Sequence, residues 1–192
     1  MRVLVACEES QVVTKAFRER GHEAYSCDIV PCSGGHPEWH IQDDVLKHLN
    51  DGWDIIIAHP PCTYISNMSN CRIKEPGRIE LRRKGMAFFM KFVDVNIPKV
   101  VIENPRGLPE REYRKADQII QPYQFGHPAS KATCLWLKNL PVLNHTEIVA
   151  PERKHDGKRY RTWVDTVKGS NKSKTRSKTF EGIARAMAEQ WG

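Results

Sequence analysis

The sequence lacks any apolar run that approaches the roughly 20 residues needed for a membrane-spanning helix. Its opening, MRVLVACEES, turns polar too soon for a secretory signal and is typical of a first β-strand. We therefore expect a cytoplasmic protein with no membrane contact. The sequence has no internal repeat, and its 192 residues, 40% of them hydrophobic and 28% charged, predict a single domain with a sizeable core.

Glycine is missing from ACEESQ (residues 6–11), the turn between the first predicted strand and the first predicted helix. A dinucleotide-binding fingerprint requires glycines at such a turn, so we do not expect a pyrophosphate cradle here. An adenosine cofactor without phosphates fits this turn better.

Cysteine is sparse, and six cysteines in a chain without a signal indicate reduced thiols rather than disulfides. A structural zinc is one alternative, because Cys27, Cys32, His36 and His40 offer four potential ligands. Their spacing is loose for such a site. We favour buried cysteines and loop histidines, and expect no metal.

Positive charge is unevenly placed. The formal net charge is +7, and residues 151–178 contain ten Lys/Arg against three Asp/Glu, with Tyr160 and Trp163 among them. This pattern suits a polyanion such as nucleic acid, although a solvated loop would look similar. We expect a mobile loop over KGSNKSKTRSK (residues 168–178). The predicted nucleic-acid contacts are Arg159, Arg161, Lys172, Lys174, Arg176 and Lys178.

The hydrophobic pattern alternates between strands and helices. Strands are predicted over residues 2–7, 23–30, 53–59, 98–105 and 132–141, the last compatible with an antiparallel strand. Helices are predicted over residues 10–21, 43–52, 78–95 and 179–191. Strands that alternate with helices of this length predict an α/β protein with a doubly wound, mostly parallel sheet.

Polar or reactive residues follow the predicted strands, where ligands bind in such sheets. They are Cys7 and Glu8, Asp28, His59 to Cys62, and Glu103 with Asn104. Asp28 is placed to accept hydrogen bonds from ribose hydroxyls, and Asp44 could receive an adenine amino group. For Asp43 and Asp44, a helix cap is an equally good interpretation.

Cys62 and Glu103 form a reactive pair. A thiolate nucleophile and a carboxyl group that donates a proton can add across the conjugated C=C–N system of cytosine, with sulfur at C6 and the proton at N3. C5 then becomes nucleophilic. We expect burial to keep Glu103 partly protonated near neutral pH. A buried thiol and a helix-capping glutamate are the alternative interpretation for each residue taken singly.

These residues resemble the DNA (cytosine-5)-methyltransferases. HPPCTYIS is similar to the Pro-Cys nucleophile loop of that family, and VIENP to its Glu-Asn motif, 41 residues after the cysteine. Residues 1–29 follow the layout of its S-adenosylmethionine segment. QDDVLKHL, FGHPASKATCLWL and TFEGIARAMAEQW resemble three later motifs in the usual order. Small phage or prophage methylase-like proteins without a full target-recognition domain are the nearest in appearance.

The resemblance implies a Rossmann-like methyltransferase fold and S-adenosylmethionine-dependent methylation of cytosine at C5 in DNA, through a covalent Cys62–C6 adduct, in a bacterial host cell. The implied catalytic residues are Cys62, Glu103, Asn104 and Lys131, with Asn104 positioning the nucleophile loop. The implied cofactor-binding residues are Cys7, Glu8, Ser10, Asp28, Ile29, Asp44, Val45, His59 and Pro60.

The sequence departs from the family at several motifs. Cys7, Glu8 and Glu9 replace the glycines of the cofactor loop, and the Gln and two Arg of a later motif fall on Ala129, Lys131 and Thr133. Residues 138–178 are too few for a separate target-recognition domain, which the basic stretch at 151–178 replaces. Duplex DNA, single-stranded DNA, a free cytosine nucleotide, and a partner subunit that supplies target recognition all stay open.

Two other functions are compatible with the same residues. HPPC has the outline of the Asp/Asn-Pro-Pro-aromatic loop of DNA amino-methyltransferases, but Cys62 offers no aromatic face to stack on a flipped base. A catalytically degenerate protein that binds nucleic acid or a methylase partner would explain the altered cofactor turn. It would not explain why both Cys62 and Glu103 are present.

Overall fold

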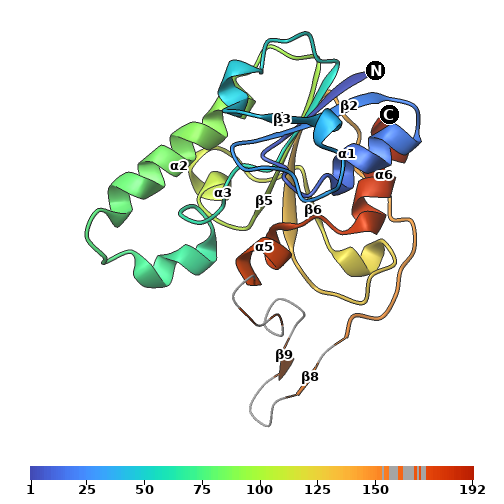
Figure 1. Ribbon diagram of the computed structural model, residues 1–192. Helices are drawn as coiled ribbons and strands as arrows, with labels where there is room; N and C mark the ends of the chain where they lie inside the picture. The colour runs from blue at the N-terminus through green and yellow to red at the C-terminus, as the bar shows by residue number, and fades with distance from the viewer. Residues whose placement is uncertain (153, 156–159, 162–166, 168, 170–171) are drawn as a thin grey trace.

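A computed structural model describes residues 1–152, 154–155, 160–161, 167, 169 and 172–192. Its centre is a seven-stranded sheet of order β3-β2-β1-β4-β5-β7-β6 (Figure 1). Strands β1 to β5 are parallel, and β7 runs antiparallel to β5 and β6. The strands are β1 (Arg2–Ala6), β2 (Glu23–Asp28), β3 (His40–Gln42), β4 (Ile55–Ala58), β5 (Lys99–Pro105), β6 (Gln118–Ile120) and β7 (Thr133–Lys138). A separate pair joins β8 (Lys154–His155) to β9 (Tyr160–Arg161).

Helices cover both faces of the sheet (Figure 1). The α-helices are α1 (Val12–Glu19), α2 (Arg78–Val93), α3 (Pro109–Glu112), α5 (Lys172–Ser177) and α6 (Glu181–Trp191). Short 3-10 helices are η1 (Pro37–Trp39), η2 (Val45–Lys47), η3 (Asn67–Arg72) and η4 (Pro122–Gln124). Within the described residues, no helix is long and apolar enough to cross a membrane.

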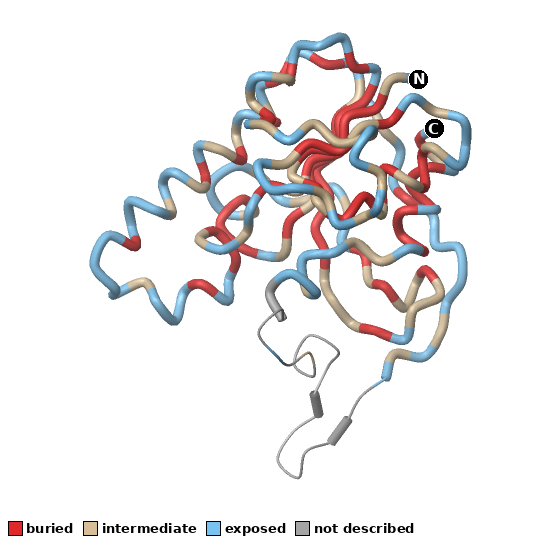
Figure 2. Tube along the Cα trace, in the orientation of Figure 1, coloured by how far each residue is buried: buried red, intermediate tan, exposed pale blue. Residues whose placement is uncertain are grey.

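The core has two halves because successive side chains of a strand point to opposite faces. Val3, Val5 and Ile57 pack with α1 and α6 on one face. Leu4 and Ile56 pack with α2 on the other. Figure 2 shows the buried residues concentrated in the central strands. The predicted doubly wound α/β architecture is therefore confirmed, as is the antiparallel direction of the strand within residues 132–141.

Two predicted elements were wrong. Residues 43–52 form only the short η2, because Asp44 caps it through Leu46 N and the His48 ring contacts Asp43 and Asp51, which folds the chain back. Within residues 168–178, where a loop was predicted, the structure has α5. The short strands β3 and β6 and helix α3 were not predicted at all, since three or four residues carry no usable periodicity.

Candidate active site

The carboxyl ends of β4 and β5 bring the predicted reactive residues together. Ala58 of β4 pairs with Ile102 of β5, so the residues that follow, His59 and Glu103, lie side by side. The same register places Pro60 next to Asn104. Cys62 follows two residues later in the loop after β4 and is partly buried. One edge of two neighbouring strands thus supplies a thiol, an imidazole, a carboxylate and an amide.

His59 and Glu103 are in direct contact. His59 Nδ1 lies 2.8 Å from Glu103 Oε2, and the two side chains are only 13% and 11% exposed. A carboxylate can only accept a hydrogen bond, so Nδ1 carries the proton of this contact. His59 Nε2 is buried and, among the described residues, has no hydrogen-bond partner. The sequence predicts that His59 binds the cofactor; the structure places one nitrogen of its ring against Glu103.

Burial and pairing act in opposite directions on these two groups. Burial raises the pKa of Glu103, but the hydrogen bond and the charge of His59, with Lys131 and Thr179, outweigh it and hold the pKa below its ordinary value. Burial lowers the pKa of His59, and the contact with Glu103 outweighs it in the same way, so the pKa of His59 is raised. Glu103 is therefore ionised at neutral pH, which corrects the expectation of a partly protonated carboxyl group.

Asn104 ties the loop after β4 to β5. Its Nδ2 donates to the carbonyl oxygen of Pro60 at 2.7 Å, and the residue is 1% exposed. Beyond Pro60 the loop turns tightly, because the carbonyl of Cys62 accepts from Ile65 N at 3.2 Å and from Ser66 N at 3.0 Å. These bonds fix the backbone on both sides of the thiol.

The loop after β5 packs against the same turn. Leu108 N donates to Ile65 O at 2.7 Å, and Ser66 pairs with Gly107 in an antiparallel bridge. A Cβ atom at Gly107 would lie 2.1 Å from Ile65 O, so only glycine permits this approach. Sequence reasoning missed Gly107, because nothing in its local sequence shows which segment comes close to it.

The Cys62 thiol is partly buried. Burial raises its pKa, the negative charge of Glu103 raises it further, and the nearby Lys131 lowers it. Cys62 therefore rests as a thiol rather than as a thiolate in the free protein, and its proton must leave before the sulfur can attack.

Lys131 and Thr179 reach the site from the far end of the chain. Because β7 is antiparallel to β5, its first residue, Thr133, pairs with Pro105, and Lys131 lies just before it at the carboxyl edge. Lys131 Nζ donates to Lys178 O at 3.4 Å, and Thr179 Oγ1 donates to Glu103 Oε2 at 3.4 Å. Lys131 was predicted at the site. Thr179 was not, since hydroxyl residues before a helix are usually caps.

The turn after β1 has no glycine, and two of its residues adopt a strained backbone conformation. Cys7 and Gln11 have φ values of 60° and 58°, in the left-handed region that favours glycine. Gln11 exchanges two hydrogen bonds with the backbone of His36, and a Cβ at Gly34 would lie 2.4 Å from the Cβ of Gln11. The loop after β2 therefore closes on this turn. Gln11 and Gly34 were not predicted.

Glu8 serves the helix that follows it. Its carboxylate accepts from Val13 N at 2.7 Å and from both N and Oγ1 of Thr14, at 3.2 and 2.7 Å, while Ser10 Oγ lies 3.5 Å away. Glu8 is 5% exposed. These bonds satisfy donors at the start of α1. Glu8 was predicted to bind the cofactor, but its side chain is turned into the helix.

The remaining predicted cofactor residues lie at the end of β2 or at the start of η2. Burial raises the pKa of the Cys7 thiol, and the charges of Asp28 and Asp44 raise it further. Asp28 Oδ1 accepts from Val30 N, and Asp44 Oδ1 accepts from Leu46 N, which is the predicted cap. Ile29 is 73% exposed beside Asp28, whereas Val45 is buried. The edge between β1, β2 and η2 is thus lined by two carboxylates and an exposed aliphatic side chain.

The alternative zinc site is not assembled. Both ring nitrogens of His40 are engaged, with Ser26 Oγ at 2.8 Å and Val30 O at 2.9 Å, and His36 contacts Glu38. Cys27 Sγ faces the carbonyl of Asp43. Within the described residues, no group of three or more potential metal ligands occurs.

Part of the predicted nucleic-acid stretch folds onto the site. Lys174 Nζ of α5 lies 3.3 Å from Glu9 Oε2 in the first turn. The Nε of Arg176 is buried and has no hydrogen-bond partner among the residues that the structure describes. Lys178 is exposed and contacts Lys131 through its carbonyl. Arg159 lies outside the described residues, and only the backbones of Arg161 and Lys172 are described.

No protein-family model matches the sequence, and no curated protein does either. Among solved structures, a putative DNA modification methyltransferase encoded within a prophage of E. coli matches with a TM-score of 0.50 at 15% identity, over 78% of this chain and 52% of that one. The Dnmt2 methyltransferase of S. pombe matches with a TM-score of 0.50 at 17% identity, over 74% of this chain and 51% of that one. The chain has a methyltransferase fold. It spans about half the length of these structures.

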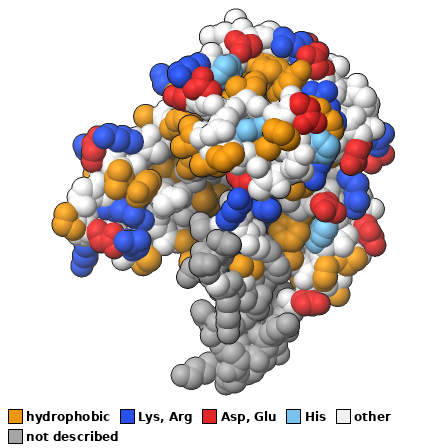
Figure 3. Space-filling view, in the orientation of Figure 1, with side chains coloured by type: hydrophobic (Ala, Val, Ile, Leu, Met, Phe, Trp, Pro, Cys, Tyr) orange, Lys and Arg blue, Asp and Glu red, His pale blue; other side chains and the backbone are white. Residues whose placement is uncertain are grey.

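A lobe projects from this methyltransferase fold beside the Cys62 loop. It consists of η3 and the first turns of α2, and residues 67–84 hold six Lys/Arg against two Glu. Arg78 braces it, stacking over the Tyr64 ring at 4.7 Å and donating to Thr63 O at 3.5 Å. Figure 3 shows charged and hydrophobic side chains exposed together on this lobe. Sequence reasoning assigned it only to a helix and missed its charge.

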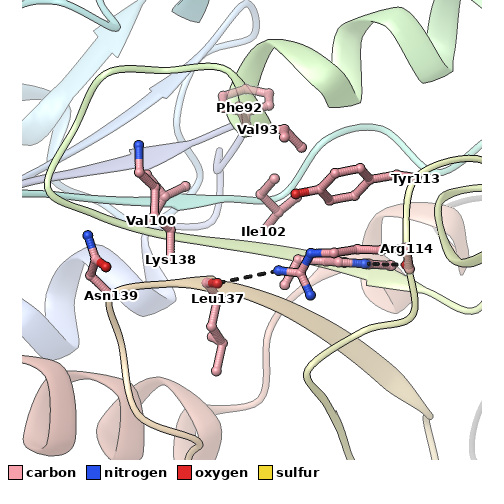
Figure 4. A pocket seen from close by; sticks show the side chains of 10 residues that line it. Phe92, Val93, Val100, Ile102, Tyr113, Arg114, Leu137, Lys138 and Asn139 are labelled. Atoms are coloured by element: carbon pink, nitrogen blue, oxygen red, sulfur yellow. Dashed lines mark hydrogen bonds between the residues drawn. The ribbon is translucent and has the colours of Figure 1, made fainter.

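A groove of about 290 Å³ lies on the face of the sheet that α2 covers. Figure 4 shows Phe92 and Val93 of α2, with Tyr113 and Arg114, around the middle of β5. Ile102 lines it, and Glu103, the next residue of β5, points to the opposite face. The groove of this methyltransferase fold is therefore separate from Cys62 and Glu103.

Proposed function

We propose that this protein methylates cytosine at C5 in DNA, with S-adenosylmethionine as the methyl donor. One observation supports the proposal above the others. The partly buried thiol of Cys62 and the ionised carboxylate of Glu103 extend from the ends of two adjacent parallel strands, and Asn104 ties the two strand ends together. A solitary buried cysteine would need neither a braced loop nor a facing carboxylate.

The proposed chemistry is a conjugate addition to the pyrimidine ring. The sulfur of Cys62 forms a bond to C6, N3 takes a proton beside Glu103, and C5 becomes nucleophilic. After C5 gains its methyl group and loses its proton, the sulfur leaves and the ring is restored. Asn104 holds the nucleophile loop through Pro60 O, so the thiol stays in place during both steps.

The residues around Cys7 suit a phosphate-free adenosine cofactor. Asp28 has one carboxylate oxygen engaged with Val30 N, which leaves the other for ribose hydroxyls, and Ile29 offers an apolar surface to an adenine ring. Asp44 has one oxygen in a cap and one for an adenine amino group. S-adenosylmethionine, when bound, supplies an electrophilic methyl group.

Nucleic acid is the proposed substrate because positive charge gathers in two segments of the chain. The lobe formed by η3 and the start of α2 has a formal charge of +4 and is braced on the Cys62 loop through Arg78. Residues 151–178 contribute +7 more. Phosphate contacts from such surfaces give affinity without sequence choice, so we expect broad sequence specificity unless a partner subunit adds selection.

Methyl transfer can be tested directly. The protein is incubated with radiolabelled S-adenosylmethionine and either duplex or single-stranded DNA, and the DNA is digested to nucleosides. We expect the label in 5-methylcytosine. Label on an exocyclic amine would support an amino-methyltransferase instead, and binding of DNA without transfer would support a degenerate binding protein.

The nucleophile is tested by trapping. DNA that contains 5-fluorocytosine should form a stable covalent adduct with the wild-type protein, because the fluorine at C5 cannot leave as a proton would. The adduct should be missing in Cys62→Ser and unchanged in Cys71→Ser, an exposed cysteine in η3 that serves as the matched control. An adduct that persists in Cys62→Ser would remove Cys62 from this role.

A further inference from the structure

We propose that His59 and Thr179 are positioning residues that hold Glu103 as a carboxylate, so that Glu103 carries the Cys62 proton to N3 of cytosine and is never the original proton source. This inference rests on the proposed function and specifies the state of its central acid–base group.

Both positioning residues act on the same oxygen atom. His59 Nδ1 lies 2.8 Å from Glu103 Oε2, and Thr179 Oγ1 donates to that oxygen at 3.4 Å. Among the described residues, no hydrogen bond reaches Oε1 of Glu103. The carboxylate is therefore fixed through one oxygen and free at the other, which is the arrangement required of a group that must meet a substrate.

The charged groups around His59 and Glu103 influence the protonation state of both side chains. Three charged or titratable groups face the pair besides its own members: Glu8 from the turn after β1, Lys131 from the segment before β7, and Cys62 from the loop after β4. Without His59, burial would favour the neutral carboxylic acid at Glu103, and only Lys131 and Thr179 would oppose it. A positively charged His59 in contact with Glu103 favours the carboxylate instead.

The proton then follows a closed path. As the Cys62 sulfur uses an electron pair to bond C6, its S–H proton passes to the Glu103 carboxylate. The C5=C6 electrons move to C4–C5, the C4=N3 electrons move to N3, and N3 takes the proton from Glu103. After methylation, C5 loses its proton to solvent, the sulfur leaves with its electron pair, and the N3 proton returns through Glu103. No external acid is required.

His59→Gln separates the effect of charge from that of hydrogen bonding, because the glutamine amide still donates a hydrogen bond but cannot become positively charged. We measure the rate of adduct formation with 5-fluorocytosine DNA against pH. In wild type, the rate of adduct formation should fall on the acid side only below the ordinary pKa range of glutamate. In His59→Gln this fall should move up by about 1 pH unit or more, since burial of Glu103 is no longer offset. Profiles that coincide would overturn the proposal.

A second measurement does not depend on catalysis. The side-chain carboxyl carbon of Glu103, labelled with ¹³C and assigned by its loss in Glu103→Gln, is titrated by NMR in wild type and in His59→Gln. We expect a lower midpoint in wild type, and equal midpoints would also overturn the proposal. If the NMR shift occurs but wild type forms no adduct at any pH, the positioning role holds and the proposed methylation fails.

Thr179 provides an independent variant in case His59→Gln does not fold. Thr179→Val keeps the shape and removes the donor, so the Glu103 midpoint should rise, by less than in His59→Gln. Thr179→Ser keeps a hydroxyl and should restore the wild-type midpoint. A purely structural role for Thr179 would give the same midpoint in Val and Ser variants of equal stability, which contradicts the proposal.

Discussion

The side-chain amide of Asn104 donates to the carbonyl oxygen of Pro60 at 2.7 Å, between the ends of two adjacent parallel strands. Asn104 is buried, and its bond ties the loop carrying Cys62 to the strand carrying Glu103. Asn104 Oδ1 is buried without a partner in the described part of the chain, where the Nδ2 donor accounts for the side-chain bonding of this amide.

Asn104→Asp tests that donor at nearly constant shape. The new carboxylate would face the Pro60 carbonyl, which can only accept, and would leave a buried acceptor without a donor. We expect a loss of about 1–3 kcal/mol in the free energy of unfolding and a slower formation of the 5-fluorocytosine adduct. Urea denaturation and adduct kinetics measure the two effects. Asn144→Asp, at an exposed position, serves as the control.

Comparing Gly107→Ala with a control variant should separate two effects of a glycine substitution, a clash between neighbouring loops and local backbone strain. A Cβ at Gly107 would lie 2.1 Å from Ile65 O, so the loops after β4 and β5 must move apart. Gly21→Ala is the matched control, because Gly21 has a φ of 80° and nothing within 4 Å of a built Cβ. We expect the control to lose about 1–2 kcal/mol of stability from left-handed strain and to keep full adduct formation. Gly107→Ala should lose adduct formation as well, and an unaffected rate would contradict a rigid loop pair.

Salt dependence distinguishes the two basic surfaces. The affinity for duplex DNA is measured by fluorescence anisotropy between 50 and 200 mM salt, where each lost phosphate contact flattens the slope by about 0.9. One variant set neutralises Arg72, Arg82, Arg83 and Lys84 on the lobe, and a second neutralises Lys172, Lys174, Arg176 and Lys178. We expect both sets to flatten the slope. Lys91→Gln with Lys99→Gln, at the other end of α2 and the start of β5, should not.

An unchanged slope in either set would show that its charges only solvate the surface. The second set has a specific internal comparison, because Lys174 is paired with Glu9 at 3.3 Å. Lys174→Gln alone should change the slope less than Lys178→Gln, since DNA must first displace Glu9 from Lys174.

The His59–Glu103 contact should give stability a defined pH window. Glu103 has its pKa lowered, so its contribution is present above the unfolded value of about 4.3 and is lost as pH falls through the folded pKa. His59 has its pKa raised, so its contribution is complete below about 6.5 and is lost as pH rises through the folded pKa. Both pKa shifts arise from the same His59–Glu103 interaction, so its contribution to the free energy of unfolding is counted once.

Wild type should therefore exceed His59→Gln most clearly between about pH 4.5 and 6.5, by about 1.5–3 kcal/mol, and less at pH 9. Denaturant unfolding at a series of pH values measures this difference. His145→Gln, at an exposed histidine, should show no such window. A difference that is constant with pH would mean that His59 stabilises the fold by packing alone.

The sequence allowed prediction of the strand ends but not of what pairs across them. Ile55 to Ile57 and the strand before Glu103 are apolar enough to predict buried strands, so Cys62 and Glu103 could be placed at one edge. The contact of His59 with Glu103 depends on the Ala58–Ile102 register, which no local pattern encodes. Thr179 and Gly107 matter because of segments that are distant in sequence. The protonation state of Glu103 was predicted wrongly for the same reason. The apolar strand predicted that Glu103 is buried, but no sequence pattern predicted its contact with His59.

The buried carboxylate of Glu8 has a consequence for which ligands this edge can accept. In nucleotide-binding sheets, the start of the first helix is a ready receptor for phosphate, because its free N–H groups and dipole attract an anion. Here the chain supplies its own anion, and the N–H groups of Val13 and Thr14 are already taken. A pyrophosphate arriving there would meet the side chain of Glu8 and two N–H groups that are already engaged. Glu8 thus occupies, from within the chain, the position at the start of α1 that a bound phosphate would take.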